Sequence, residues 1–257
     1  MNSDQPSRNL LLQALPTEEF EVLRPRLELV ELTKDAVLVE AGAALSHVYL
    51  PLSGVISMVV RLSEGQTVEV AMVGRDSLFG ASAALDGGIS LTDAVVVLPG
   101  TAAILNVADF RAAAERSAAL RALLARHEQA LFAQAQQSAA CNASHTVEAR
   151  LSRCLLRVRD LCDSETLPLT QEFLAQMIGV QRNAVSNRSG RHWPPLRTRF
   201  PPRRAKCNLQ TCRGKFAQAE QGSDRRQALP CLAEPMRKTW LEASRRWSLF
   251  MIHATRR

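Results

Sequence analysis

Residues 170–187 have the layout of two short helices joined by a tight turn, and no other stretch constrains the fold as strongly. Thr170 can cap the first helix, because its hydroxyl can accept a hydrogen bond from the backbone of the first turn. The buried face of that helix would consist of Phe173, Leu174 and Met177. Gly179 supplies the left-handed backbone that such a turn needs, and Val180 fills the angle between the two helices.

The second helix would begin at Gln181 and expose polar side chains at its N-terminus. Arg182 and Asn183 point outward, while Ala184 and Val185 face inward. Outward arginine and asparagine can pair with guanine and adenine edges in a major groove. The segment therefore favours a DNA-reading helix-turn-helix over an ordinary helical hairpin, although the spacing alone fits both. The candidate DNA-binding residues are Thr170, Gln171, Gln181, Arg182, Asn183, Ser186 and Asn187.

The net charge of +7 is concentrated at the end of the chain. Residues 1–187 hold 15 Lys and Arg against 21 Asp and Glu, a balance of −6, whereas residues 188–257 hold 17 against 4, a balance of +13. The basic character therefore says little about the folded part. No apolar run reaches the about 18 residues of a membrane span, and the first residues lack a signal-peptide layout. We expect a cytoplasmic protein without a membrane partner.

Neither the cysteines nor the histidines follow a pattern typical of a metal or catalytic site. No pair among the six cysteines has C-x-x-C spacing, which favours reduced thiols. The five histidines are dispersed, and the sequence contains no nucleophile elbow or phosphate loop. We therefore expect no metal, no cofactor and no catalytic residues. A metal enzyme built on a similar fold would need clustered ligands.

Residues 30–108 look like short strands separated by glycines. Candidate strands lie at residues 37–39, 48–50, 55–62, 68–72, 95–98 and 103–107. Turn signals between β-branched runs indicate a small antiparallel barrel or roll, with a β-sandwich as the alternative. An amphipathic helical lead over residues 7–30 precedes the strands. Residues 8–108 would together form an effector-sensing domain of an α+β protein.

Asp109 is expected to cap an alanine-rich helix that runs without Gly or Pro to about Ser144. Its apolar and small residues form a heptad-like seam at Leu120, Leu124, His127, Leu131, Gln134, Ser138 and Cys141. Such a helix measures about 45 Å, whereas a roll of this size is only about 25–30 Å across. We therefore expect a dimerisation helix over residues 109–144, followed by a DNA-binding domain over residues 145–187. The dimer-interface residues would be Leu120, Leu124 and Leu131.

The order of roll, long helix, short helix and helix-turn-helix resembles the Crp/Fnr family of bacterial transcription regulators. Four strings carry the resemblance, at residues 47–54, 68–74, 145–151 and 169–187. The resemblance implies a homodimer with an effector-binding roll and a winged helix-turn-helix that reads a palindromic operator in double-stranded DNA. It also implies a small-molecule effector, whose identity is open, and contact with RNA polymerase.

Two sensing chemistries of that family do not fit these residues. Its cyclic-nucleotide binders carry a Gly-Glu pair for the ribose and then an Arg with Ser or Thr for the phosphate. Here the residue directly after Gly80 is Ala81 and not Glu, and no Arg lies between Arg75 and Arg111. A buried phosphate without a cation would be poorly compensated, so we do not expect cyclic AMP to bind. Its oxygen sensors use clustered N-terminal cysteines, and the first cysteine here is Cys141.

The chain departs from the family again after residue 187. Gly190 weakens the recognition helix and the Pro194-Pro195 pair ends it, where the family continues for two turns into a wing. Codons can be chosen for residues 188–195 so that a shifted frame reads Val-Gly-Ala-Ala-Leu-Ala-Ala, a plausible helix. We therefore interpret residues 188–257 as an out-of-frame, disordered tail. A genuine basic DNA-binding tail and a natural linker are the alternatives. A frameshift would leave an effector-binding or interaction module that has lost DNA binding.

Overall fold

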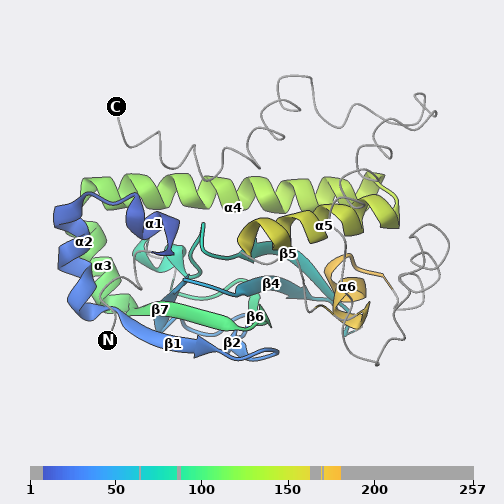
Figure 1. Ribbon diagram of the computed structural model, residues 1–257, viewed down its shortest axis with the longest axis horizontal. Coiled ribbons are helices and arrows are strands. Elements are labelled where there is room, and N and C mark those ends of the chain that lie inside the picture. The colour runs from blue at the N-terminus through green and yellow to red at the C-terminus, as the bar shows by residue number, and fades with distance from the viewer. Residues whose placement is uncertain (1–7, 64, 86–87, 163–168, 170, 181–257) are drawn as a thin grey trace, which may run out of the picture.

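The computed structural model of the chain describes residues 8–63, 65–85, 88–162, 169 and 171–180. Its long helix α4 (Ala118–Ser144) runs along the whole molecule, above two β-sheets (Figure 1). The N-terminal helices gather at one end of the sheets, and helix α6 (Gln171–Met177) lies at the other.

The two sheets form the antiparallel roll that the sequence predicted. The strands are β1 (Glu28–Leu32), β2 (Val37–Val39), β3 (His47–Pro51), β4 (Val55–Arg61), β5 (Thr67–Val73), β6 (Asp93–Leu98) and β7 (Gly100–Asn106). One sheet has the order β1-β7-β3 and the other β2-β6-β4-β5, with every pair antiparallel. Alternate β-branched and leucine side chains from both sheets fill the space between them. The predicted fold class is confirmed.

The predicted helical lead is correct only in its first part. Helices α1 (Leu10–Gln13) and α2 (Thr17–Leu23) and the 3-10 turn η2 (Arg24–Arg26) form it. Pro25 has no backbone N–H to continue α2, so the helix ends there. Residues 28–30, expected to be helical, instead begin β1, whose backbone pairs with β7.

The helix expected from Asp109 to about Ser144 is two helices. Helix α3 (Val107–Arg116) is capped by Asn106, whose Oδ1 accepts a hydrogen bond from Ala108 N at 2.8 Å. Asp109 therefore is not the cap; it lies in the first turn and pairs with Arg26 at 2.7 Å. The chain then breaks at Ser117, whose Oγ accepts from Leu120 N at 2.8 Å and so starts α4. The end of α4 at Ser144 is as predicted.

The heptad-like seam of α4 packs on the chain's own roll, which corrects the predicted dimer interface. Leu120 is 4 % exposed and Leu124 is fully buried, both in one core with α1, α2 and α3. Leu131 is partly buried against the interior of the roll. The roll is not the only body that α4 covers within the chain, so the length of α4 does not by itself require a partner. Helix α5 (Val147–Leu161) packs beside the second half of α4 and extends the surface (Figure 1).

The C-terminal helices share a core with the roll. This core combines Val55, Met72, Val97 and Leu98 of the sheets with Leu151, Cys154, Leu155, Val158 and Leu161 of α5 and with Leu169, Leu174, Ala175, Met177 and Ile178 around α6. Gly74 lets α5 approach closely, because a Cβ there would lie 2.7 Å from a Leu161 methyl group. The roll and the first helix of the predicted DNA-binding unit are therefore one packed body.

We predict that Leu124→Ala lowers the free energy of unfolding by about 2–5 kcal/mol, because it leaves a cavity in a fully buried site. Leu62→Ala is the matched control, since Leu62 is 45 % exposed and should change stability by less than about 0.5 kcal/mol. Urea denaturation measures both. A Leu124→Ala protein that unfolds like the wild type would contradict the inward packing of α4.

Candidate functional site

Of the segment predicted to be a helix-turn-helix, the structure describes one helix, α6, and the turn after it. Leu174 and Met177 of α6 are buried and Phe173 is partly buried, as predicted. Gly179 has a φ of +63°, the left-handed backbone expected for the turn, and Val180 packs against the shared core. Gln171 is the first residue of α6. The candidate residues Thr170, Gln181, Arg182, Asn183, Ser186 and Asn187, and the tail after them, lie outside the described residues.

Two contacts attach this turn to the rest of the molecule. Arg150 of α5 donates from Nη1 to the carbonyl oxygen of Ile178 at 3.0 Å, which holds the end of α6. Val180, which follows Gly179, packs against the shared core that includes Met72 of β5. The turn that would aim a recognition helix is therefore held by α5 and by β5.

Strand β5 is at the edge of its sheet, and α4 and α5 satisfy its free backbone. Gln134 of α4 accepts from Met72 N at 2.7 Å and donates to Met72 O at 3.4 Å. Arg157 of α5 donates to the same carbonyl at 3.4 Å. An edge strand with unpaired backbone groups is a template for other strands, and here side chains occupy it. Gln134 was predicted as part of a dimer seam, so its role inside the chain is a correction.

A buried set of charges lies between β5 and α5. Asp76, just after β5, forms a two-point ion pair with Arg157 at 2.7 and 3.2 Å. Glu69 of β5 is 5 % exposed and accepts from Ser57 Oγ at 2.8 Å. Burial raises the pKa of Glu69 to about 7, although the Ser57 hydrogen bond and the Arg153 and Arg157 charges lower it. Glu69 therefore titrates near neutrality, at the contact between the roll and the C-terminal helices.

The segment that would hold a cyclic phosphate instead holds a carboxylate. Asp93, 4 % exposed, accepts from Ala41 N at 2.8 Å and pairs with Arg61 at 2.8 Å. The Ala41 hydrogen bond, with a smaller contribution from Arg61, keeps the pKa of Asp93 below its usual value. The short turn η3 (Ala81–Leu85) that follows Gly80 carries no acidic or basic side chain. A fixed anion whose neighbouring cation is already engaged repels a phosphate, so these residues do not fit a cyclic nucleotide.

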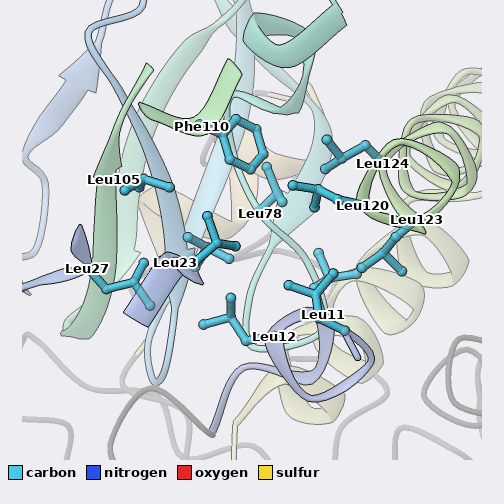
Figure 2. Close-up of a pocket in the computed structure, with 12 residues that line it drawn as sticks. Leu11, Leu12, Leu23, Leu27, Leu78, Leu105, Phe110, Leu120, Leu123 and Leu124 are labelled. Atoms are coloured by element: carbon cyan, nitrogen blue, oxygen red, sulfur yellow. The ribbon is translucent and has the colours of Figure 1, made fainter. Parts of the chain in front are cut away.

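Figure 2 shows a hollow in the core near α1, α2, α3 and α4. It is lined by leucines and Phe110 from these helices and the adjoining strands. It encloses about 20 Å³, and no polar side chain lines it. Because its lining is apolar, the cavity does not bind water, and its volume would admit at most about one molecule of the size of water. It is a gap in the packing of the core and too small for an effector.

Ser77, His127 and Glu128 have the order of a catalytic triad but lack access to a substrate. Ser77 Oγ lies 2.7 Å from His127 Nε2, and His127 Nδ1 lies 3.6 Å from Glu128 Oε1. Ser77 is fully buried and His127 is 1 % exposed. The backbone N–H of Leu78 also donates to Nε2, which fixes the ring. These groups tie α4 to the turn after β5, and a nucleophile needs an open face that Ser77 does not have.

The outer face of α4 carries a second heptad-like pattern, which the sequence did not reveal. Exposed residues recur at spacings of four and three at Ala118, Ala122, Ala125, Gln129, Phe132, Gln136, Ala139 and Ala143. Phe132 is 65 % exposed, and residues 129–144 contain no charged side chain. A helix face that normally meets water is rich in charge. We call these eight residues the outer stripe.

Neither a metal site nor a membrane-spanning helix occurs in the described part of the chain. No group of three His, Cys, Asp or Glu side chains comes together there as a set of metal ligands. None of the helices described is long and apolar enough to cross a bilayer.

Comparison with known proteins shows what the roll is similar to. Residues 29–117 match the model of the cyclic nucleotide-binding domain family. The match covers the strands of the roll and α3, and it describes the fold of this part of the chain. No curated protein sequence matches the chain.

The roll and the helices after it are similar to solved regulators. A protein from Eubacterium rectale assigned to the Crp/Fnr family of transcriptional regulators is 12 % identical with a TM-score of 0.65, over 82 % of this chain and 99 % of that one. FixK2 from Bradyrhizobium japonicum is 16 % identical with a TM-score of 0.61, over 73 % and 96 %. A Crp/Fnr-family regulator from Thermus thermophilus is 19 % identical with a TM-score of 0.58, over 74 % and 98 %. The shared fold is that of Crp/Fnr regulators.

We predict that cyclic AMP does not bind to the roll, because no Arg lies between Arg75 and Arg111 to hold the phosphate and Arg61 is already paired with the buried Asp93. Isothermal calorimetry should show only heat of dilution, for the wild type and equally for the Arg61→Ala control. A micromolar dissociation constant, about −8 kcal/mol, would contradict this account of the site.

Proposed function

We propose that the chain is a transcription regulator of the Crp/Fnr type, a homodimer whose DNA binding responds to a small effector. The observation that carries the proposal is the α6–Gly179 turn, the first half of a helix-turn-helix, attached to a roll of the cyclic nucleotide-binding fold. Regulators of this fold have the same order of roll, long helix and C-terminal helices. Ser77 and His127 resemble a catalytic pair but are buried, which favours a binding role over a catalytic one.

Operator recognition would rest on Arg182 and Asn183, with Thr170, Gln171, Gln181, Ser186 and Asn187 supporting them. Arg150 and Val180 support this assignment, because their contacts hold the turn from which residue 181 continues. A recognition helix held at its first residue presents its N-terminal side chains to base edges at a fixed angle. A two-fold dimer would present two such helices to the half-sites of a palindrome. RNA polymerase would be a further partner at the promoter.

Dimerisation would use the outer stripe of α4. The inner seam is occupied by the chain's own roll, which leaves the outer face for a partner. Alanine at most stripe positions lets two helices approach closely, and Phe132 supplies the large apolar contact. The uncharged residues 129–144 suit a surface that becomes buried on association.

A second candidate function follows from the charge division at residue 187. The +13 balance of residues 188–257 and the Pro and Gly residues that open them favour a tail that was shifted out of frame. Such a chain would keep its effector-sensing and dimer-forming parts and act as an interaction module. Its tail would still add phosphate contacts without sequence preference.

For the dimer, we predict that Phe132→Glu gives folded monomers, because Phe132 is 65 % exposed within one chain and would contact the partner helix. Leu91→Glu is the matched control, since Leu91 is 89 % exposed but lies outside α4. Light scattering should report a monomer for the first variant and a dimer for the second. A dimeric Phe132→Glu protein would rule out the outer stripe as the interface.

For DNA, we predict that a frame-repaired chain prefers its own promoter, whereas the chain as given discriminates little between promoter and random DNA. In the repaired chain, Arg182→Ala should cost about 1–3 kcal/mol and relax preference at one base position. Arg116→Ala removes an exposed cation remote from the turn and is the control. Competition binding at near-physiological salt measures the promoter preference of all four proteins. If the unrepaired chain prefers its promoter by about a thousandfold, residues 188–257 are a functional domain and the frameshift account is wrong.

A further inference from the structure

The contact between the roll and α5 buries ionisable groups from both sides. The strands contribute Glu69, and the turn after β5 contributes Asp76. Helix α5 contributes Arg157 and also Arg153, which is only 9 % exposed. Around them lies the shared apolar core, with Met72 and Leu98 on the roll side and Leu155 and Val158 on the helix side. Water is therefore excluded from a contact that contains charged groups.

The two carboxylates of this contact are held in different ways. Asp76 has a two-point ion pair with Arg157, so it is compensated as an anion. Glu69 forms no ion pair within the described part of the chain and has one hydrogen bond, from Ser57. Its nearest charges act at longer range, from Arg153 and Arg157. Glu69 is thus the group whose ionised form the contact compensates least.

The elements packed around Glu69 present few other groups that titrate. Helix α5 presents Arg153, Arg157 and the Cys154 thiol, whose pKa burial raises to about 12, so that it stays neutral. Strand β4 presents the Ser57 hydroxyl, and the turn after β5 presents Asp76. Helix α4 contributes the Gln134 amide and the Cys141 thiol, and the side chains of α6 that are described are apolar. Glu69 is therefore the member of this contact whose charge changes near neutrality.

We propose that Glu69 is a proton-binding site that controls the docking of α5 on the roll, with α5 docked when Glu69 is protonated and released as Glu69 ionises. Only the effect of α5 release on DNA binding rests on the proposed function. Arg150 joins α5 to the end of α6, so release of α5 would remove one of the contacts that hold the turn at Gly179 and leave α6 attached to β5 alone. The ligand of this site is the proton, and the response is a change in the orientation of the DNA-binding unit.

The sign follows from linkage. The pKa of Glu69 is about 7 when α5 is docked and returns toward 4.5 when water reaches the carboxyl group. The docked state therefore binds the proton more tightly, and its advantage is complete below pH 4.5 and lost as the pH rises through 7. Between about pH 6 and about pH 8 the docking equilibrium should shift toward release by about tenfold.

Cys154 reports docking in the full chain, because it is fully buried between α5 and the roll. Its labelling by iodoacetamide is followed by mass spectrometry at about pH 6 and about pH 8, and each rate is divided by that of a short cysteine peptide at the same pH. We expect the normalised rate to rise about tenfold in the wild type and to stay flat in Glu69→Gln, which keeps the shape and cannot ionise. Equal profiles for the two proteins would overturn the proposal.

Two further measurements separate docking from other causes. Hydrogen exchange of the β3 and β7 amides reports global opening; if it changes in parallel with Cys154 labelling, Glu69 controls unfolding and the docking proposal is wrong. Ser57→Ala removes the hydrogen bond that lowers the Glu69 pKa, so the labelling midpoint should move to higher pH. This variant also serves if Glu69→Gln does not fold, because an unchanged midpoint would overturn the proposal.

Operator affinity of the frame-repaired chain at the same two pH values distinguishes this proposal from the proposed function. A Cys154 response without DNA binding at either pH overturns the proposed function alone. A normalised Cys154 labelling rate that is equal at the two pH values overturns the proton-binding site alone, whatever the DNA affinity. When both hold, operator affinity should change with pH in the wild type and not in Glu69→Gln.

Discussion

The packing of α4 and α5 against the roll is the constraint on which the rest of the structure depends. Leu120 and Leu124 fix one half of α4 in the core, and Gln134 binds the backbone of the edge strand with the other half. This leaves the outer stripe facing away and gives α5 a second surface to pack on. Through Arg150, the same packing fixes the turn at Gly179. One continuous body therefore connects the roll to α6 and to the turn after it.

That body determines which signals the protein can receive. The roll has the cyclic nucleotide-binding fold, yet the stretch from Gly80 to Asp93 has no Arg to hold a phosphate and ends in a buried carboxylate. The leucine-lined hollow has no room for a metabolite. The buried ionisable group that is least compensated is Glu69, at the contact between the two functional units. A proton at that contact would act directly on the orientation of the helix-turn-helix, without a pathway through the roll.

The sequence predicted the elements better than the directions in which they face. Glycine spacing and β-branched runs predicted six of the seven strands, because both signals are local. The missed strand, β1, follows Pro25 and is stabilised by pairing with distant β7, which no local pattern reveals. The seam at Leu124 was assigned to a partner because heptad spacing does not say which body a helix covers. The outer stripe was missed because alanine and glutamine are weak apolar signals. Glu69 and Asp93 emerged only when the fold brought Ser57, Arg61 and Ala41 beside them.

The central claim is that two copies of this chain, joined through α4, present two helix-turn-helix units to one DNA duplex. Its most direct test is the mass of the complex between the frame-repaired chain and its promoter fragment. Sedimentation velocity measures this mass, first with the protein in excess and then with the DNA in excess. We expect a complex of two chains and one duplex at every ratio, with no detectable complex of one chain. A saturated complex with a single chain, or many chains that accumulate along the duplex without a limit, would contradict the account.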